Sequence, residues 1–189
     1  GADVYHAGIA DDVRAALASP ELARFEHGAL VGYSLGGHVV LTTARDAALD
    51  ARVRAVAAIC PPLDLEATVD AIRRLDRRHY EAHVLRSLVR QHDAVAVRAA
   101  REGLAIRSIP SDVRRVRTIR EWDERVVCPR YGHPDARTYY ERTSVGPHLR
   151  ALARPALVVI ADADPMVPLR PHVLNKGHTR IFSLQSLFR

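Results

Sequence analysis

Ser34 is the residue whose surroundings most directly suggest chemistry. It stands in the run Gly32-Tyr33-Ser34-Leu35-Gly36, with a glycine two residues to either side. A serine hydroxyl can act as a nucleophile when a sharp turn lifts it clear of the backbone, within reach of a base and a substrate carbonyl. Such a turn forces the serine into strained backbone angles, and side chains two residues away would collide. The spacing therefore predicts a G-x-S-x-G nucleophile elbow centred on Ser34.

The residues on either side of Ser34 fit this turn. The apolar run before it is typical of a buried strand, and residues 35–49 carry the apolar stripe of a helix. The N-terminus of that helix would direct its free N–H groups at the serine, so that the Leu35 N–H would stabilise a developing oxyanion. Gly37 would let the helix pack closely on the sheet. We interpret His38, on the helix leading away, as a packed or capping histidine rather than a base.

The rest of the chain predicts an α/β fold. Residues 53–60 and 156–161 read as two further strands, and their alternation with helices favours a parallel sheet flanked by helices. The interval 61–153 shows helical spacings, with separate helices expected near residues 80–88 and 95–100. An insertion of this length between two strands is usually a lid, so we expect a helical lid over about residues 61–153.

Together these segments resemble the α/β-hydrolase superfamily, and most closely its abhydrolase-domain branch of candidate esterases, which includes the plant embryogenesis-associated proteins. The resemblance implies a partial α/β-hydrolase domain over residues 1–173, followed by an atypical tail at 174–189. It is carried by YHAGIADDVRAAL (5–17), GYSLGGH (32–38), RVRAVAAICPPLDL (52–65), TIREWDERV (118–126), YGHPDARTYYERTS (131–144) and RPALVVIADADPMVP (154–168).

The resemblance also implies a catalytic triad. It makes Ser34 the nucleophile and places the acid after the strand at 156–161, where Asp162 and Asp164 compete. Asp164 is favoured because it directly precedes the Pro-Met-Val-Pro turn, and its carboxylate would orient the catalytic histidine. His178, which follows Gly177, is the candidate base, and His172 is a weaker one.

The resemblance begins part-way through the family pattern, which predicts that the chain is a fragment. We expect the first strands, and the loop with the second oxyanion donor, to come from an upstream segment. The sheet should then have about three strands, with an open apolar edge beside Ser34. Residues 174–189 hold the only lysine and the only asparagine but no alanine, which suggests a tail read in another frame or a fusion scar.

The charge of the chain does not indicate a nucleic-acid partner. The formal net charge is +6, but Lys176 is the only lysine among 28 basic residues, and the arginines alternate with acids. Such interleaving is typical of solvated helix faces. Cys60 and Cys128 lack metal-site spacing and read as small buried thiols. No stretch approaches the length of a membrane span.

We therefore expect a serine hydrolase that acts on small-molecule esters. The predicted reaction is that of a carboxylesterase on apolar acyl esters through a Ser34–His178–Asp164 triad, with no metal and no cofactor. The alternative is a catalytically incomplete remnant of the fold with no activity of its own, because the elbow and the acid are present while the base and the oxyanion loop are in doubt.

Overall fold

The computed structural model divides into two compact units, each treated by itself. The sheet unit comprises residues 7–65 and 143–189, and the helical unit comprises residues 1–6 and 66–142. The structure describes residues 4–74, 76, 78–104, 113–168 and 179–184. Within these ranges no helix is both long and apolar enough to cross a bilayer.

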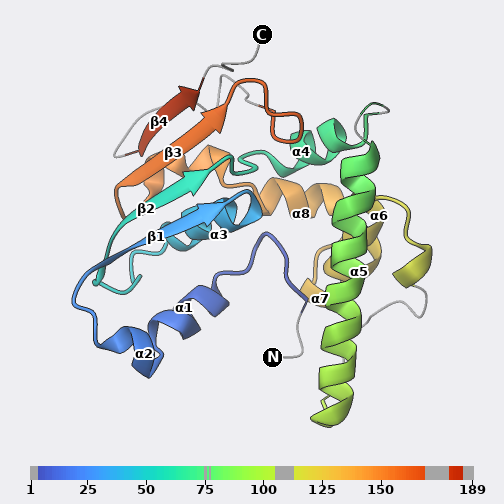
Figure 1. Ribbon diagram of the computed structural model, residues 1–189, viewed down its shortest axis with the longest axis horizontal. Coiled ribbons are helices and arrows are strands. Elements are labelled where there is room, and N and C mark those ends of the chain that lie inside the picture. The colour runs from blue at the N-terminus through green and yellow to red at the C-terminus, as the bar shows by residue number, and fades with distance from the viewer. Residues whose placement is uncertain (1–3, 75, 77, 105–112, 169–178, 185–189) are drawn as a thin grey trace. The chain divides into compact units, whose positions relative to one another are not determined.

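The sheet unit is built on four parallel strands that lie side by side in chain order (Figure 1). They are β1 (Gly28–Tyr33), β2 (Val53–Ile59), β3 (Ala156–Ala161) and β4 (Thr179–Leu184). Parallel neighbours need crossover connections, and α3 (Leu35–Thr43) connects β1 to β2 and packs against both. Two short helices, α1 (Asp11–Leu17) and α2 (Pro20–Ala23), precede β1, and the 3-10 helix η4 (Gly146–Ala151) precedes β3.

The predicted parallel α/β sheet is confirmed, with differences in detail. Among the described residues the sheet has four strands where about three were expected, and β4 lies within the stretch 174–189. The helix after Ser34 ends at Thr43 rather than near residue 49.

The two faces of the sheet differ in burial. One face carries fully buried side chains, including Val158 and Ile160, which pack with Leu41 of α3 and Leu149 of η4. On the other face Val31, Tyr33 and Phe182 are 57, 68 and 54% exposed. The prediction of a buried strand before Ser34 is therefore wrong, because alternate side chains of β1 point to the uncovered face.

The ends of the long insertion between β2 and β3 are held together inside the sheet unit. The Gly146 N–H donates to the Leu63 carbonyl over 2.9 Å, and the Leu65 N–H donates to the Ser144 hydroxyl over 3.0 Å. We call these four residues the clasp. It brings the chain back beside the point from which it left the sheet unit.

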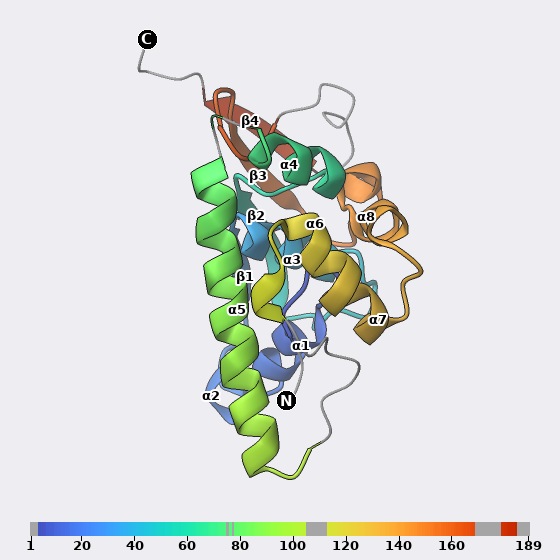
Figure 2. The same ribbon diagram turned by 90° about the vertical axis from the view of Figure 1, so that its right-hand side faces the viewer.

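The helical unit is formed mainly by the insertion (Figure 2). Its elements are α4 (Leu65–Ile72), α5 (Arg78–Arg101), η2 (Val113–Arg115), α6 (Ile119–Trp122), a π-helical turn η3 (Asp123–Val127), α7 (Cys128–Tyr131) and α8 (Ala136–Thr143). The expected break between residues 88 and 95 is wrong: α5 is one helix of 24 residues. Neither glycine nor proline interrupts it, so nothing in that stretch ends the helix. That these helices form a lid stays a prediction.

A buried acid lies at the centre of the helical unit. The Tyr140 hydroxyl donates to Asp123 Oδ2 over 2.6 Å, and the Arg120 guanidinium lies over the Tyr140 ring, 5.3 Å from its centroid. Burial raises the pKa of Asp123 to about 7, against the lowering effects of Tyr140 and Arg120. The carboxyl group is thus held near the midpoint of its titration at neutral pH.

The uneven burial of the sheet predicts effects of very different size for two similar substitutions. Val31→Thr, on the exposed face, should change the free energy of unfolding by less than about 0.5 kcal/mol. Val158→Thr, on the buried face, should cost about 2 kcal/mol because it buries a hydroxyl in an apolar core. Urea unfolding of both variants checks this. Equal losses would show that the face carrying Val31 is covered in solution.

The buried acid predicts a pH dependence of stability. The folded-state pKa of Asp123 lies above its ordinary value of 3.8, so the folded state binds the proton more tightly than the unfolded chain. The stability contributed by this group is complete below about pH 4 and is lost as the pH rises to about 7. Asp123→Asn should flatten this loss, measured by urea unfolding between pH 4.5 and 7.5. Glu102→Gln, at an exposed position of the same unit, should keep the wild-type slope.

Candidate functional site

Ser34 lies between β1 and α3 with backbone angles that few non-glycine residues adopt. Its φ is 48° and its ψ is −123°, and its side chain is exposed. Two hydrogen bonds hold this conformation: the Ser34 N–H donates to the Ile59 carbonyl over 2.8 Å, and the His38 N–H donates to the Ser34 carbonyl over 3.1 Å. The residue therefore projects from the carboxyl end of β1 in the geometry that the sequence predicted.

The turn requires a glycine at position 32. A Cβ atom on Gly32 would lie 2.2 Å from the Gly36 carbonyl oxygen and 2.6 Å from the Gly37 nitrogen. Gly36 differs from the prediction, because a Cβ atom there would meet nothing within 4 Å. At Gly37 an added Cβ would lie 3.0 Å from the Gly32 carbonyl and 3.3 Å from the Ala58 Cβ, so this glycine lets α3 approach the sheet closely. The collision that sets the spacing is thus between Gly32 and the first turn of α3.

The first turn of α3 can stabilise negative charge beside Ser34. Leu35 is the first residue of the helix, and the first N–H groups of a helix have no acceptor within it. They carry the positive end of the helix dipole, which favours an anion at this place. The position of Leu35 is therefore suited to an oxyanion donor.

His38 is a structural residue. Its side chain is fully buried, with Nδ1 2.8 Å from the Pro62 carbonyl oxygen and Nε2 3.0 Å from the Thr143 carbonyl oxygen. Burial lowers the pKa of the imidazole, although both carbonyl contacts act in the opposite sense. With both ring nitrogens engaged in the core, this histidine cannot serve Ser34 as a base.

Three residues follow the ends of three neighbouring strands at one edge of the sheet. Ser34 follows β1, Cys60 follows β2 and Asp164 lies shortly after β3 (Figure 1). Tyr33 pairs with Ile59, and Ile59 pairs with Val159, so the strands reach this edge at similar heights. The carboxyl edge of an open parallel sheet is where ligands of α/β proteins bind.

Asp164 is held in a fixed orientation. Its Oδ1 accepts hydrogen bonds from the Met166 N–H over 2.8 Å and the Val167 N–H over 2.9 Å, and its own N–H donates to the Ala161 carbonyl. The side chain of Asp164 is half-buried, whereas Asp162 is exposed. These contacts favour Asp164 over Asp162 as the acid of the site.

Cys60 is the residue of the site that the sequence analysis missed. Its φ is 47°, and its N–H donates to the Val159 carbonyl over 2.8 Å. Burial raises the pKa of its thiol, the Ala161 backbone lowers it, and the charge of the nearby Asp164 carboxylate raises it. The surroundings of Cys60 thus disfavour the thiolate, which is the nucleophilic form. The sequence around Cys60 contains no motif that predicts its place beside Asp164.

The base of the site is not among these residues. His178 and His172 lie outside the described residues. In the described part of the sheet unit, no histidine is hydrogen-bonded to Ser34 or to Asp164. Across the described residues of the whole chain, no cluster of three or more His, Cys, Asp or Glu side chains is placed to hold a metal ion.

Comparisons with known proteins extend this picture. A family model described as alpha/beta hydrolase fold matches residues 2–180. The chain is 30% identical over 166 residues to an Escherichia coli (strain K12) protein named "Putative esterase YheT". The match covers 87% of this chain and 48% of that protein, so the chain spans about half the length of this curated relative.

Two solved structures are similar at lower identity, and the first of them, with a TM-score above 0.5, has the same fold. The structure of Est816, described as an N-acyl homoserine lactone degrading enzyme, is 18% identical with a TM-score of 0.51, covering 98% of this chain and 68% of that one. An esterase domain of a Rhodothermus marinus protein is 20% identical with a TM-score of 0.46, covering 95% of this chain and 58% of that one.

The contact between Cys60 and Asp164 predicts a change in thiol reactivity. Asp164→Asn should lower the pKa of the Cys60 thiol, since it removes a negative charge that raises this pKa. An asparagine oxygen can still accept from Met166 and Val167, so the turn is kept. The rate of iodoacetamide alkylation at Cys60, followed against pH by peptide mass spectrometry, measures the midpoint.

Asp162→Asn is the matched control and should leave the midpoint unchanged. Cys128 is buried with its pKa raised to about 12 and should not react. An equal shift in both aspartate variants would show that Cys60 responds to net charge rather than to Asp164.

Proposed function

Because the chain belongs to the alpha/beta hydrolase fold family, we propose that it is a serine hydrolase, a carboxylesterase with Ser34 as its nucleophile. The observation that carries the proposal is the conformation of Ser34: an exposed serine with φ of 48° between a parallel strand and a helix. Strained backbone of this kind persists where the surrounding structure enforces it, and it is concentrated at functional sites. The esterase name of the Escherichia coli relative supports ester hydrolysis as the reaction.

In this scheme Ser34 Oγ attacks the ester carbonyl carbon while an imidazole accepts the hydroxyl proton. The Leu35 N–H donates to the oxyanion of the tetrahedral intermediate. The intermediate collapses to an acyl-enzyme, and the imidazolium returns the proton to the departing alcohol. Water then attacks the acyl group, with the imidazole again accepting a proton, and releases the acid and free Ser34.

Asp164 would orient the imidazole and stabilise its charged form. An imidazole hydrogen-bonded at both nitrogens spans roughly 8 Å between a serine oxygen and a carboxylate oxygen. Neighbouring strands are about 4.8 Å apart, so the ends of β1 and β3, on either side of β2, are separated by about 10 Å. One histidine can therefore bridge the two residues across the end of β2.

The proposed base is a histidine, and the candidates are His178, which the resemblance implies, and His172. Thr179, the residue after His178, pairs with Ala156 at the start of β3, at the opposite edge of the sheet from Ser34, and this position argues against His178. His178→Ala and His172→Ala therefore belong in the same experiment as the serine variant. The proposed substrates are small esters with an apolar acyl or alcohol group.

The proposal predicts that hydrolysis depends on Ser34. With p-nitrophenyl butyrate and octanoate, Ser34→Ala should lower the turnover number by about 10⁴-fold or more. Asp164→Asn should lower it by about 10²- to 10⁴-fold, and Asp162→Asn should leave it within about twofold. A fluorophosphonate probe, which needs an activated serine but not turnover, should label Ser34.

Three outcomes would contradict parts of this proposal. Turnover that survives Ser34→Ala would place the chemistry elsewhere. Turnover that survives His178→Ala but is lost in His172→Ala would reassign the base. A folded protein that is neither labelled nor active would favour the alternative, a catalytically incomplete remnant of the fold.

A further inference from the structure

A groove lined by arginines runs along one side of α5 in the helical unit. Its volume is about 620 Å³, and its second wall is the segment from Arg114 to Arg117. Five of its lining residues are exposed arginines: Arg78, Arg86, Arg90, Arg114 and Arg117. On α5 the arginines at positions 78, 86 and 90 are spaced by multiples of four residues, so they share one face over about 18 Å of helix.

The positive charge of this groove is largely uncompensated. Arg114 pairs with Asp93 over 3.0 Å. The one carboxylate in the lining, Glu81, is buried and accepts a hydrogen bond from the Ile119 N–H over 2.9 Å. In the described part of the chain, no carboxylate forms an ion pair with the four other arginines of the groove. Several positive charges along one groove attract an anion.

The groove also has an apolar floor. Leu85 and Val116 are buried and Val89 is half-buried, and all three line the groove between the arginines. No aromatic side chain is among its lining residues, so it offers no platform on which a nucleic-acid base could stack. The lining fits a ligand that is apolar along its body and negatively charged at its end.

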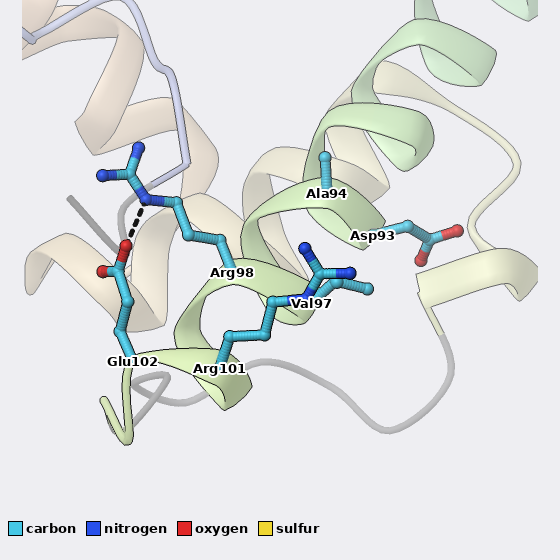
Figure 3. A pocket seen from close by; sticks show the side chains of 6 residues that line it. All are labelled: Asp93, Ala94, Val97, Arg98, Arg101 and Glu102. Carbon is cyan, nitrogen blue, oxygen red and sulfur yellow. Dashed lines mark hydrogen bonds and ion pairs between the residues drawn. The ribbon is translucent and has the colours of Figure 1, made fainter.

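A second hollow on the same helix shows that this pattern is not general to α5 (Figure 3). It carries two arginines, Arg98 and Arg101, together with two acids, Asp93 and Glu102. Arg98 pairs with Glu102 over 2.8 Å. Asp93 lines this hollow too but pairs with Arg114 of the groove. The hollow thus has two acids for its two arginines, whereas the groove lining has one buried acid for five arginines.

We propose that the groove between α5 and the segment 114–117 binds an anionic amphiphile, a molecule with an apolar chain and a phosphate or carboxylate end. Guanidinium groups match the two oxygens of such an end with paired, charge-assisted hydrogen bonds. Leu85, Val89 and Val116 would cover the chain. The proposal does not depend on the esterase proposal, because none of its residues belongs to the site around Ser34.

Calorimetric titration of the full chain with dodecyl phosphate and dodecanoate, kept below their micelle concentrations, tests the proposal. We expect saturable binding of one molecule per chain. Arg86→Gln combined with Arg90→Gln should weaken binding about tenfold or more. Arg98→Gln combined with Arg101→Gln removes the same charge from the other hollow and should leave the affinity unchanged. Likewise Val89→Asn should weaken binding, while Val97→Asn should not.

Each of the following results would overturn the proposal. Equal weakening by both arginine pairs would indicate attraction to net charge alone. If dodecyltrimethylammonium binds as tightly as dodecyl phosphate, the arginines do not select for negative charge. If inorganic phosphate binds as tightly as dodecyl phosphate, the apolar floor does not contribute to binding. Sedimentation with phosphatidylglycerol vesicles without binding of either free amphiphile would identify a membrane-surface contact instead. Ser34→Ala should bind both probes normally, which separates this test from that of the esterase.

Discussion

The approach of Gly32 to the first turn of α3 is the contact on which the candidate site depends. A side chain on Gly32 would collide with the backbone of Gly36 and Gly37, so the helix can begin directly after the strand only because position 32 has none. The same contact forces Ser34 to a positive φ, a strain of about 1–3 kcal/mol. Hydrogen bonds to Ile59 and from His38 hold the strained residue from both sides. The exposed serine and the helix N-terminus beside it thus both depend on the absence of a side chain at position 32.

The two faces of the sheet that positions this site are covered to different extents. Parallel sheets are usually covered on both faces, because crossover helices lie on each side. Here one face is packed by α3 and η4, while Val31, Tyr33 and Phe182 line a face that is largely open to solvent. The face packed by α3 and η4 therefore provides most of the core that holds the ends of β1, β2 and β3 in place. The position of Ser34 relative to Asp164 depends on this packing. His38, a buried residue of α3 with its ring nitrogens close to two backbone carbonyls, is part of that layer.

The parts of the structure that short-range patterns govern could be predicted from the sequence. The turn at Ser34, the strands after Arg52 and Pro155, and the parallel sheet follow from glycine spacing and apolar runs. The exposure of β1 could not, because the burial of a strand depends on which distant elements cover it. The unbroken α5 was missed because polar residues interrupt its apolar stripe without interrupting the helix. Cys60 was missed because its positive φ has no local signature comparable to the glycine spacing around Ser34.

The clasp has a consequence for how this chain can vary. Leu63 and Leu65 are hydrogen-bonded to Gly146 and Ser144, respectively, so the two ends of the insertion are held together. The alignment of β2 with β3 therefore does not depend on the length of the chain between these ends. The entropy of closing a loop grows only with the logarithm of its length, so doubling the insertion would cost about 0.6 kcal/mol. The insertion thus leaves the sheet unit and returns to it beside one pair of hydrogen bonds. Substitutions, lengthening or wholesale exchange of its helices can therefore accumulate in evolution while the strands keep their alignment.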